Sequence, residues 1–231
     1  MLKFDKVTLE LGNNVVLRDI SFEVMPGEVV AILGISGAGK SSLFRLLTGE
    51  TRPTKGQILL DKFSLADLNA ESLQKYRRQI GIAFQDFRLL PKKTVFDNVA
   101  FALEVCGMDE LIGQRVPELL ELVGLAHRKD SFPHELSGGE KQRTAIARAL
   151  VHYPKILIAD EITGNLDPKN SRDIADLLQH LNTTKGMTIL FSTHDPVLVQ
   201  GLAPRVVRLD EGKILFDKKE CTLEKAFEGV M

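Results

Sequence analysis

Residues 1–30 alternate between apolar and polar side chains. Leu2–Phe4, Val7–Leu11 and Ile20–Val24 each show a two-residue period, which is typical of strands that bury one face. Gly12–Asn14 and Pro26–Gly27 separate these runs and have the composition of turns. The pattern therefore predicts a β-rich N-terminal region.

Apolar runs recur along the rest of the chain, and we expect strands at residues 57–60 and 80–84 and buried strands at residues 29–33, 156–159 and 188–191. Helical patterns lie between these runs, at residues 42–47, 71–79 and 168–181, the last with Asp167 as N-cap and Pro168 in its first turn. Asp210–Gly212 separates two further apolar runs and predicts a hairpin. Strands that alternate with helices predict a parallel α/β sheet.

Residues 86–153 have a helical pattern and interrupt this alternation. Thr94 is a good N-cap for a helix that runs to about Cys106. This helix is apolar on nearly every side, so it is either buried in the core or contacts a partner protein. A second helix contains Pro117, which suits a first turn but should kink the helix if it begins near Ile112. A third helix is expected from Ser137 to Ala149.

The stretch from Gly34 to Ser41 matches the phosphate-binding pattern G-x-x-x-x-G-K-[ST] between a predicted strand and a predicted helix. Glycines allow backbone N–H groups to converge on an anion, and the helix N-terminus adds partial positive charge. Lys40 can reach the β- and γ-phosphates of a nucleotide, and the Ser41 hydroxyl can hold Mg²⁺. A plain glycine turn would not need the Lys-Ser pair, so we favour a nucleotide site.

Composition limits the function classes. The chain has 231 residues, a 44% hydrophobic fraction and a net charge of −1, so we expect a packed core and no general affinity for nucleic acid. The two cysteines, Cys106 and Cys221, lack metal-ligand spacing and fit a reducing compartment. The sequence has no signal-peptide pattern and no apolar run near the ~20 residues of a membrane-spanning helix. Any role at a membrane should therefore depend on a partner.

Polar side chains follow three of the predicted strands. The C-terminal ends of these strands should lie at one edge of the sheet, beside the phosphate loop. Asp160 can then reach a Mg²⁺ held by Ser41, and Glu161 can act as general base toward water. His194 can hydrogen-bond a γ-phosphate, and Gln85 is a neutral amide that can ligate Mg²⁺ or water. Solvated acids and a structural histidine are the simpler interpretations. His127, His134, His152 and His180 have no such placement.

Leu136–Glu140 reads Leu-Ser-Gly-Gly-Glu at the start of the third predicted helix. Ser137 and Glu140 form the pattern of a capping box. A capping box does not require Gly138 and Gly139, which are poor helix formers. Exposed N–H groups of two glycines at a helix N-terminus suggest a second anion site.

These motifs, in this order, resemble the ATP-binding-cassette ATPases over nearly the whole chain. The resemblance implies a phosphate-loop NTPase fold with a RecA-like parallel-sheet core, an N-terminal antiparallel β subdomain and an inserted helical subdomain. The implied division is one domain over residues 1–231, with the core and β subdomain at about 1–85 and 154–231 and the helical subdomain at about 86–153.

The resemblance also implies ATP and Mg²⁺ as cofactors and a head-to-tail homodimer that forms with ATP. Each ATP is then held between the phosphate loop of one chain and the signature turn, Ser137–Glu140, of the other. The implied nucleotide-binding residues are Leu11, Gly34, Ile35, Ser36, Gly37, Ala38, Gly39, Lys40, Ser41 and Ser42. The implied catalytic residues are Glu161, His194 and Gln85, and the implied metal ligands are Ser41, Gln85 and Asp160. Residues that should act across the dimer are Ser137, Gly138, Gly139, Glu140 and Asp167.

Within this family, Phe84–Pro91 and Thr94–Ala100 are similar to a cell-division subgroup, whose members pair with an integral membrane protein and control cell-wall hydrolases. This implies a cytoplasmic protein at the inner face of the membrane, whose partner docks near Gln85–Val105. A transport ATPase of the lipoprotein-release or macrolide-efflux type is the main alternative. A non-transport cassette of repair or translation, or a nucleotide-binding scaffold with little turnover, are others.

The sequence departs from the family pattern at three positions. Leu11 stands where an aromatic ring usually stacks on adenine, so adenine contact should be weaker. Ile162 replaces a proline that follows the catalytic glutamate, so Glu161 should be held less rigidly and turnover should be slower. Ile35 lies in a loop that binds through its backbone, where we expect little effect.

Overall fold

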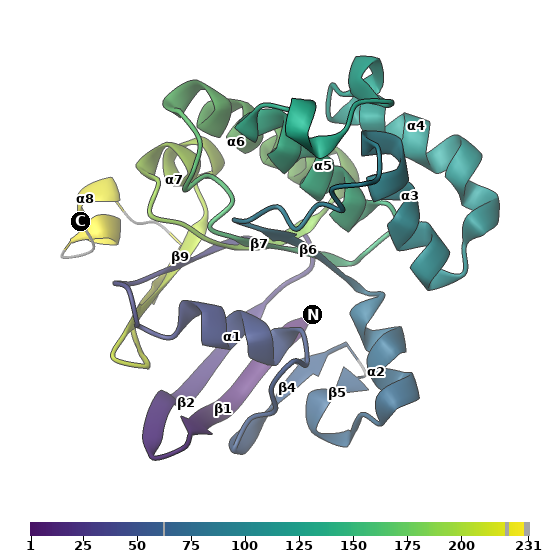
Figure 1. Ribbon diagram of the computed structural model, residues 1–231. Coiled ribbons are helices and arrows are strands. Elements are labelled where there is room, and N and C mark those ends of the chain that lie inside the picture. Colours follow the sequence, from purple (N-terminus) through teal and green to yellow (C-terminus); the bar gives the residue numbers. More distant parts are fainter. Residues whose placement is uncertain (62, 220–221, 229–231) are drawn as a thin grey trace.

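The computed structural model describes residues 1–61, 63–219 and 222–228, so the expectation for Cys221 lies outside the described residues. The strands form two sheets, one of four strands and one of six. Figure 1 shows the smaller sheet below the larger one, with most helices above.

The four-stranded sheet has the order β2-β1-β4-β5, and every neighbouring pair is antiparallel. Its strands are β1 (Leu2–Leu11), β2 (Asn14–Val24), β4 (Lys55–Leu60) and β5 (Phe63–Ser64). The sequence suggested two runs within β1, and the structure gives one strand whose register shifts between Phe4 and Val7. Lys6 has a left-handed φ of 51° there, so a bulge separates the two alternating runs.

The six-stranded sheet has the order β10-β9-β3-β8-β7-β6. Its strands are β3 (Val29–Leu33), β6 (Ile80–Phe84), β7 (Ile156–Asp160), β8 (Thr188–Ser192), β9 (Arg205–Asp210) and β10 (Lys213–Lys218). β9, β3, β8, β7 and β6 are parallel, whereas β10 returns antiparallel to β9. The predicted buried strands and the hairpin are therefore confirmed, and Glu211 and Gly212 both have positive φ in the turn.

Alternate residues of the central strands face two different hydrophobic clusters. In β3, Val30 and Ile32 belong to the cluster shared with the small sheet, and Ala31 and Leu33 to the cluster on the other face. α1 (Lys40–Leu47) fills the space between the two sheets (Figure 1). Because both faces of the large sheet are covered at its centre, β3, β7 and β8 are almost entirely apolar.

The remaining helices lie around the two sheets. They are α2 (Ala70–Arg77), α3 (Val95–Cys106), α4 (Ile112–Leu122), α5 (Gly138–Leu150), α6 (Pro168–Lys185), α7 (Pro196–Leu202) and α8 (Leu223–Phe227). α3 to α7 cover the face opposite α1, and α2 lies beside the small sheet (Figure 1). Short 3₁₀ turns connect some of them, at residues 65–67, 109–111, 126–128 and 133–135.

The caps predicted for three helices are confirmed. Thr94 caps α3 in a capping box with Asp97, Ser137 caps α5 in a capping box with Glu140, and Asp167 caps α6. α4 begins at Ile112, so Pro117 lies inside the helix and not in its first turn. Pro117 has no N–H to donate to the preceding turn, which leaves a gap in the helical hydrogen bonding.

α3 has one face in the hydrophobic core and one face that is exposed, so the core interpretation holds for only one of its faces. Val95, Val99 and Leu103 are fully buried, whereas Phe101 and Val105 are 37% and 65% exposed. The buried face belongs to the same hydrophobic cluster as β7, β8 and α6. The hydrophobic packing is therefore continuous across residues 85 and 154, and the division into subdomains stays a prediction.

α7 was not expected from the sequence, although its start repeats the signal that identified α6. Asp195 accepts a hydrogen bond from the Val197 N–H, and Pro196 occupies the first turn, as Asp167 and Pro168 do for α6. α7 is much shorter than α6, with seven residues against eighteen. β5 and α8 were not expected either, because two and five residues are too few for a periodic signal.

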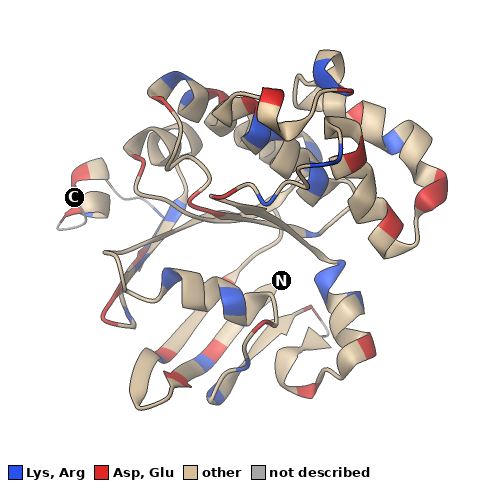
Figure 2. Ribbon diagram, viewed as in Figure 1, with Lys and Arg blue, Asp and Glu red and all other residues tan. Residues whose placement is uncertain are grey.

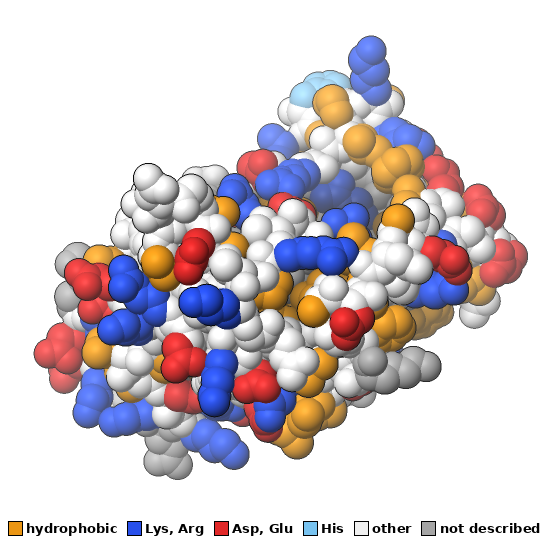
Figure 3. All heavy atoms as spheres, turned by 90° about the horizontal axis from the view of Figure 1, so that it is seen from below, with side chains coloured by type: hydrophobic (Ala, Val, Ile, Leu, Met, Phe, Trp, Pro, Cys, Tyr) orange, Lys and Arg blue, Asp and Glu red, His pale blue; other side chains and the backbone are white. Residues whose placement is uncertain are grey.

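Charges of both signs are interspersed along the ribbon (Figure 2). The face seen from below likewise mixes basic, acidic and hydrophobic side chains, without a field of one sign (Figure 3). This distribution agrees with the net charge of −1.

Candidate functional site

The phosphate-binding pattern lies in the turn from β3 to α1. Gly34, Gly37 and Gly39 have φ values of 157°, 83° and 105°. A Cβ built on Gly34 would lie 2.4 Å from the carbonyl oxygen of Leu209, and one on Gly39 would lie 2.6 Å from a methyl carbon of Leu17. Neighbouring strands therefore leave no room for side chains at these two glycines, and the loop backbone faces the cavity.

Lys40 is the first residue of α1, at the end of this loop, and is only 6% exposed. Its Nζ donates to the carbonyl oxygens of Gly34 at 2.7 Å and Ile35 at 3.2 Å. Burial lowers the pKa of Lys40, while the carboxylates of Glu161 and Asp160 oppose that shift. The ammonium is thus held at the loop, where it can meet the phosphates of a nucleotide.

Asp160 ends β7 and lies beside β8. Its Oδ1 accepts a 2.6 Å hydrogen bond from Oγ of Ser192, the last residue of β8. Burial raises the pKa of Asp160, with a further contribution from the charge of Glu161, and the Ser192 bond opposes both. Ser192 was missed in the sequence, where its only signal was its place at the end of a buried strand.

Glu161 follows β7 in a left-handed conformation, with φ of 50°. Such a conformation costs a non-glycine residue about 1–2 kcal/mol, so surrounding contacts must hold it. The Glu161 N–H donates to the carbonyl and hydroxyl oxygens of Ser192, both at 3.1 Å, and its carbonyl accepts from the N–H of Gly164. Ile162, which stands in place of a proline, is buried in the core. The backbone of Glu161 therefore has three hydrogen bonds and a buried neighbour.

The side chain of Glu161 lies between two basic groups. Its Oε1 is 3.0 Å from Nε2 of His194 and 3.9 Å from Nζ of Lys40. These three residues line a cavity of about 240 Å³ together with Val16 and the phosphate loop. Val16 was not predicted as a site residue. Its signal was the turn at Gly12–Asn14, which brings β2 back along β1.

Leu11, the position expected beside the adenine, is 48% exposed and lies outside the lining of this cavity. Gln85 follows β6 at the same edge of the sheet, next to the strand that carries Asp160. Its side chain reaches toward Gly164, where a Cβ would lie 3.1 Å from Nε2 of Gln85. The structure thus brings Gln85 to the turn that holds Glu161, and not into the cavity lining.

Ser41 and Asp160 both line a second cavity of about 130 Å³, which adjoins the first at Ser41. A hydroxyl and a buried carboxylate are oxygen ligands of the kind that Mg²⁺ prefers. Within the described residues, no three His, Cys, Asp or Glu side chains form a metal-binding cluster of their own. These residues fit a Mg²⁺ that also takes ligands from a bound nucleotide.

The predicted second anion site lies at the start of α5, and none of its residues lines either cavity. The Glu140 carboxylate accepts hydrogen bonds from the N–H and hydroxyl of Ser137, both at 2.8 Å, and pairs with Arg128 at 3.0 Å. The Ser137 hydrogen bonds and Arg128 lower the pKa of Glu140. Within one chain, the phosphate loop and the signature turn are therefore separate sites.

A groove of about 600 Å³ lies beside the exposed face of α3. Phe84, Leu90, Phe101, Ala102 and Val105 contribute apolar side chains to it. Among the described residues that line the groove, four are arginines and none is acidic; its basic members are Arg77, Arg78, Arg88, Arg148 and His152.

The groove is connected to the segment after Gln85. Phe87 and Arg88 have left-handed φ values of 58° and 47°. Arg148 of α5 donates to both of their carbonyl oxygens, at 2.8 Å and 2.6 Å. Arg148 therefore fixes the backbone that follows Gln85.

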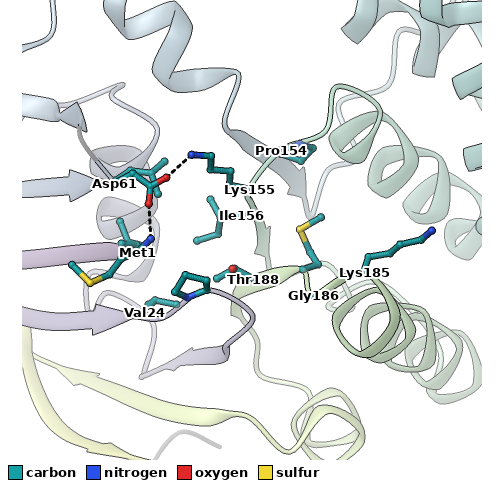
Figure 4. A pocket seen from close by; sticks show the side chains of 13 residues that line it. Met1, Val24, Asp61, Pro154, Lys155, Ile156, Lys185, Gly186 and Thr188 are labelled. Atoms are coloured by element: carbon teal, nitrogen blue, oxygen red, sulfur yellow. Dashed lines mark hydrogen bonds and ion pairs between the residues drawn. The ribbon is translucent and has the colours of Figure 1, made fainter.

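Another cavity, of about 340 Å³, lies at the opposite ends of the strands (Figure 4). Asp61 accepts from both the amino group of Met1 and Nζ of Lys155, while Lys185 extends away from them. No predicted site residue lines this cavity. Among the described residues, no helix is long and apolar enough to cross a membrane.

Comparison with known proteins adds to this geometry. The family model described as ABC transporter matches residues 17–164, more than half of the chain. The cell division ATP-binding protein FtsE of Mycobacterium tuberculosis is 48% identical over 95% of this chain and 96% of its own length. FtsE of Bacillus subtilis is 44% identical over 94% of this chain and 96% of its own length. The methionine import ATP-binding protein MetN 1 of Acinetobacter baylyi is 46% identical over 86% of this chain, but over only 56% of its own length.

Two solved structures share the fold. The ATP-binding cassette MJ0796, as a dimer in a post-hydrolysis state bound to ADP and Pi, has a TM-score of 0.83 and 33% identity over 96% of this chain and 100% of its own. The structure of cbiO1 from Clostridium perfringens has a TM-score of 0.87 and 34% identity over 98% of this chain and 90% of its own. The phosphate loop, the carboxylates after β7 and these likenesses agree. The chain belongs to the ABC transporter family, as one of its ATP-hydrolysing cassettes.

Proposed function

We propose that this chain is the ATPase subunit of a membrane complex of the FtsE–FtsX type, which regulates cell-wall hydrolysis during bacterial cell division. The observation that carries the proposal is the 44–48% identity to relatives named FtsE, over 94–96% of the chain and of those relatives in two cases. The import ATPase is matched over little more than half its own length. We therefore favour the cell-division role over a transport role.

ATP binds at the cavity between the phosphate loop and Glu161. Gly34–Ser42 cradles the phosphates, and Lys40 neutralises their charge. Val16 and Leu11 lie on the side where the base is expected, and the lack of an aromatic ring there weakens adenine contact. Val16 lines the same cavity as Lys40, which supports its place beside the nucleotide.

Ser41, Asp160 and Gln85 are the residues that would hold Mg²⁺. The ion supplies charge neutralisation at the β- and γ-phosphates when it is bound. The shared cavity of Ser41 and Asp160 supports their part in this set. Gln85 reaches the set only if its side chain turns away from Gly164.

Glu161 acts as the general base that takes a proton from the attacking water. His194 holds its carboxylate at 3.0 Å and can also contact the γ-phosphate. The hydrogen bonds of Ser192 and Gly164 to its backbone support a fixed position for the base. A positioned base contributes about 10²–10⁴ to the rate of such a reaction.

Two copies of the chain close head to tail on ATP. Ser137–Glu140 of each copy then caps the nucleotide held by the other, and Asp167 communicates between the two sites. The separation of the signature turn from the phosphate cavity in one chain supports this arrangement, and so does the dimer of the cassette MJ0796.

The groove beside α3 receives a helix of the membrane partner, and this contact holds the chain at the inner face of the membrane. Exposed Phe101 and Val105 provide apolar contact. Because the described lining of the groove has arginines and no acidic residue, we expect the partner helix to carry acidic side chains along its edge.

The test uses Glu161→Gln together with the FtsX-like membrane protein of the same cell. We expect the variant to keep ATP affinity, to lose at least about 100-fold in turnover, and to accumulate as a dimer with ATP. We also expect the wild-type chain to co-purify from membranes with that partner, through crosslinks from residues 95–105. Unchanged hydrolysis by Glu161→Gln would remove it as the base, and co-purification with a transport permease instead would overturn the cell-division role.

A further inference from the structure

The first turns of α5 and α6 pack directly against each other. A Cβ built on Gly139 would lie 2.1 Å from Oδ1 of Asn170, and one built on Gly138 would lie 3.2 Å from a methyl carbon of Leu166. Gly139 is buried, while Asn170 is half-buried. The start of α6 therefore occupies the space that side chains at the two signature glycines would need.

The side chain of Asn170 is oriented by Asp167. Oδ1 of Asp167 accepts from the backbone N–H groups of Lys169 and Asn170, at 3.0 Å and 2.9 Å, and so caps α6. Oδ2 of Asp167 accepts from Nδ2 of Asn170 at 2.6 Å. Because an ionised carboxylate only accepts hydrogen bonds, the NH₂ end of Asn170 must face Asp167, and its oxygen must face Gly139. Asn170 thus spans from Asp167 to the signature turn.

Neither helix needs this side chain for its own cap. α5 is capped by Ser137 and Glu140, which Arg128 supports from outside. α6 is capped through the backbone of Asn170 and not through its amide. The first turns of α5 and α6 therefore form through their own local hydrogen bonds. The side chain of Asn170 affects how these two turns lie relative to each other.

We propose that Asn170 is a positioning residue that fixes the signature turn Ser137–Glu140 to Asp167, so that the two move as one unit when two copies close on ATP. This inference rests on the head-to-tail dimer of the proposed function. It implies that a contact made by Asp167 with the second copy is transmitted to the signature amides of its own chain. Asn170 lines neither the phosphate cavity nor the one that adjoins it, so its effect must appear in dimer closure and not in nucleotide binding.

The experiment introduces Asn170→Ala into the Glu161→Gln chain and into the otherwise unchanged chain. Lys169→Ala is the matched control, since Lys169 is exposed and donates its backbone N–H, which the substitution keeps, to the cap. The measurements are binding of a fluorescent ATP analogue to the monomer, the dimer dissociation constant in ATP by sedimentation, the kcat and KM of hydrolysis, and thermal unfolding.

We expect Asn170→Ala to weaken the ATP-dependent dimer about tenfold, the size of a typical coupling between two sites, and to lower kcat, because a contact at Asp167 would no longer be passed to the signature turn. Monomer affinity for the analogue and the unfolding temperature should match those of Lys169→Ala. We also expect Gly139→Ala to weaken the dimer less in the Asn170→Ala chain, where the colliding amide is gone.

The outcomes separate the two proposals. If Glu161→Gln alone stays monomeric in ATP, the dimer of the proposed function fails. If it dimerises and Asn170→Ala does so equally well, the inference about Asn170 is wrong. A variant that unfolds earlier or loses monomer affinity would make Asn170 a structural residue only, which also overturns the inference.

Discussion

Lys40 is a buried cation whose partners are backbone carbonyl oxygens of its own loop. The nearest carboxylate oxygen, from Glu161, is 3.9 Å away. Burial disfavours the charged form, so a bound anion would relieve a cost that the loop already carries. The residue is therefore adapted to an anionic ligand more than to the stability of the loop.

Replacement of Lys40 by Ala should remove most nucleotide affinity and leave the fold intact. We expect a loss of at least about tenfold in affinity, because a charge-assisted contact to phosphate is worth about 1.5–3 kcal/mol. Titration with a fluorescent ATP analogue measures this, with Lys169→Ala as control. Equal binding by both variants would count against the phosphate-loop assignment.

His152 is a half-buried basic group, and its environment favours the neutral ring. Its Nε2 lies 3.3 Å from the carbonyl oxygen of Ile80, and its Nδ1 is buried without a hydrogen-bond partner. Burial lowers the pKa of His152, and the charge of Arg78 acts in the same direction. The unfolded chain therefore binds a proton more readily than the folded chain, and stability is lost as the pH falls below about 6.5.

The variant His152→Gln should remove part of this pH dependence, since Gln can still donate to Ile80 and does not titrate. We expect the free energy of unfolding to fall more for the wild type than for the variant between about pH 7.5 and 5.5. Urea unfolding at both pH values measures the difference. Identical losses would show that His152 is not buried in its neutral form.

At the scale of elements, α3 has one face in the core and one on the groove. Val99 is fully buried, whereas Val105 is 65% exposed on the same helix. Asn98 is also buried, but its amide is satisfied by the carbonyls of Leu90 and Lys93 and by the N–H of Leu90. A helix that is apolar on all sides can thus pack into the core with one face and line a groove with the other.

Substitutions on the two faces should have different effects. Val99→Asp buries an unpaired charge and should lower the free energy of unfolding by more than about 3 kcal/mol. Val105→Ser should change it by less than about 0.5 kcal/mol. We expect Val105→Ser to keep ATPase activity but to bind less to membranes that contain the partner. Urea unfolding and membrane co-sedimentation measure both effects, and normal membrane binding would rule out this face as the docking site.

At the scale of the whole molecule, the phosphate loop and the signature turn lie on separate parts of one chain, and the signature turn does not line the phosphate cavity. In the proposed head-to-tail dimer, a complete site requires two chains, so the two halves can be disabled independently. In a symmetric head-to-tail dimer, each chain supplies a different half to each site.

Two defective chains should complement each other when mixed. Lys40→Ala and Ser137→Arg, each in the Glu161→Gln background, should both fail to retain ATP in a dimer. Their mixture should form a heterodimer with one intact site, which neither variant can form alone. Size-exclusion chromatography with radiolabelled ATP measures this. No retained ATP in the mixture would mean that the two motifs do not share a site.

The sequence by itself determined the features that depend on near neighbours. The caps at Thr94, Ser137 and Asp167 need only hydrogen bonds within three residues, and the structure forms each of them. Burial on both faces of β3 and β7 follows from their continuous apolar runs. Because these interactions are short in range, they could be predicted without knowledge of the tertiary structure.

The tertiary structure alone decided how distant segments meet. It placed Ser192 against both Asp160 and Glu161, and Asn170 against Gly139, across 31 or more residues of chain in each case. The left-handed backbone of Glu161 is tolerated only because those distant hydrogen bonds hold it. Such contacts depend on the packing of β7, β8, α5 and α6 together, so no local pattern carries them.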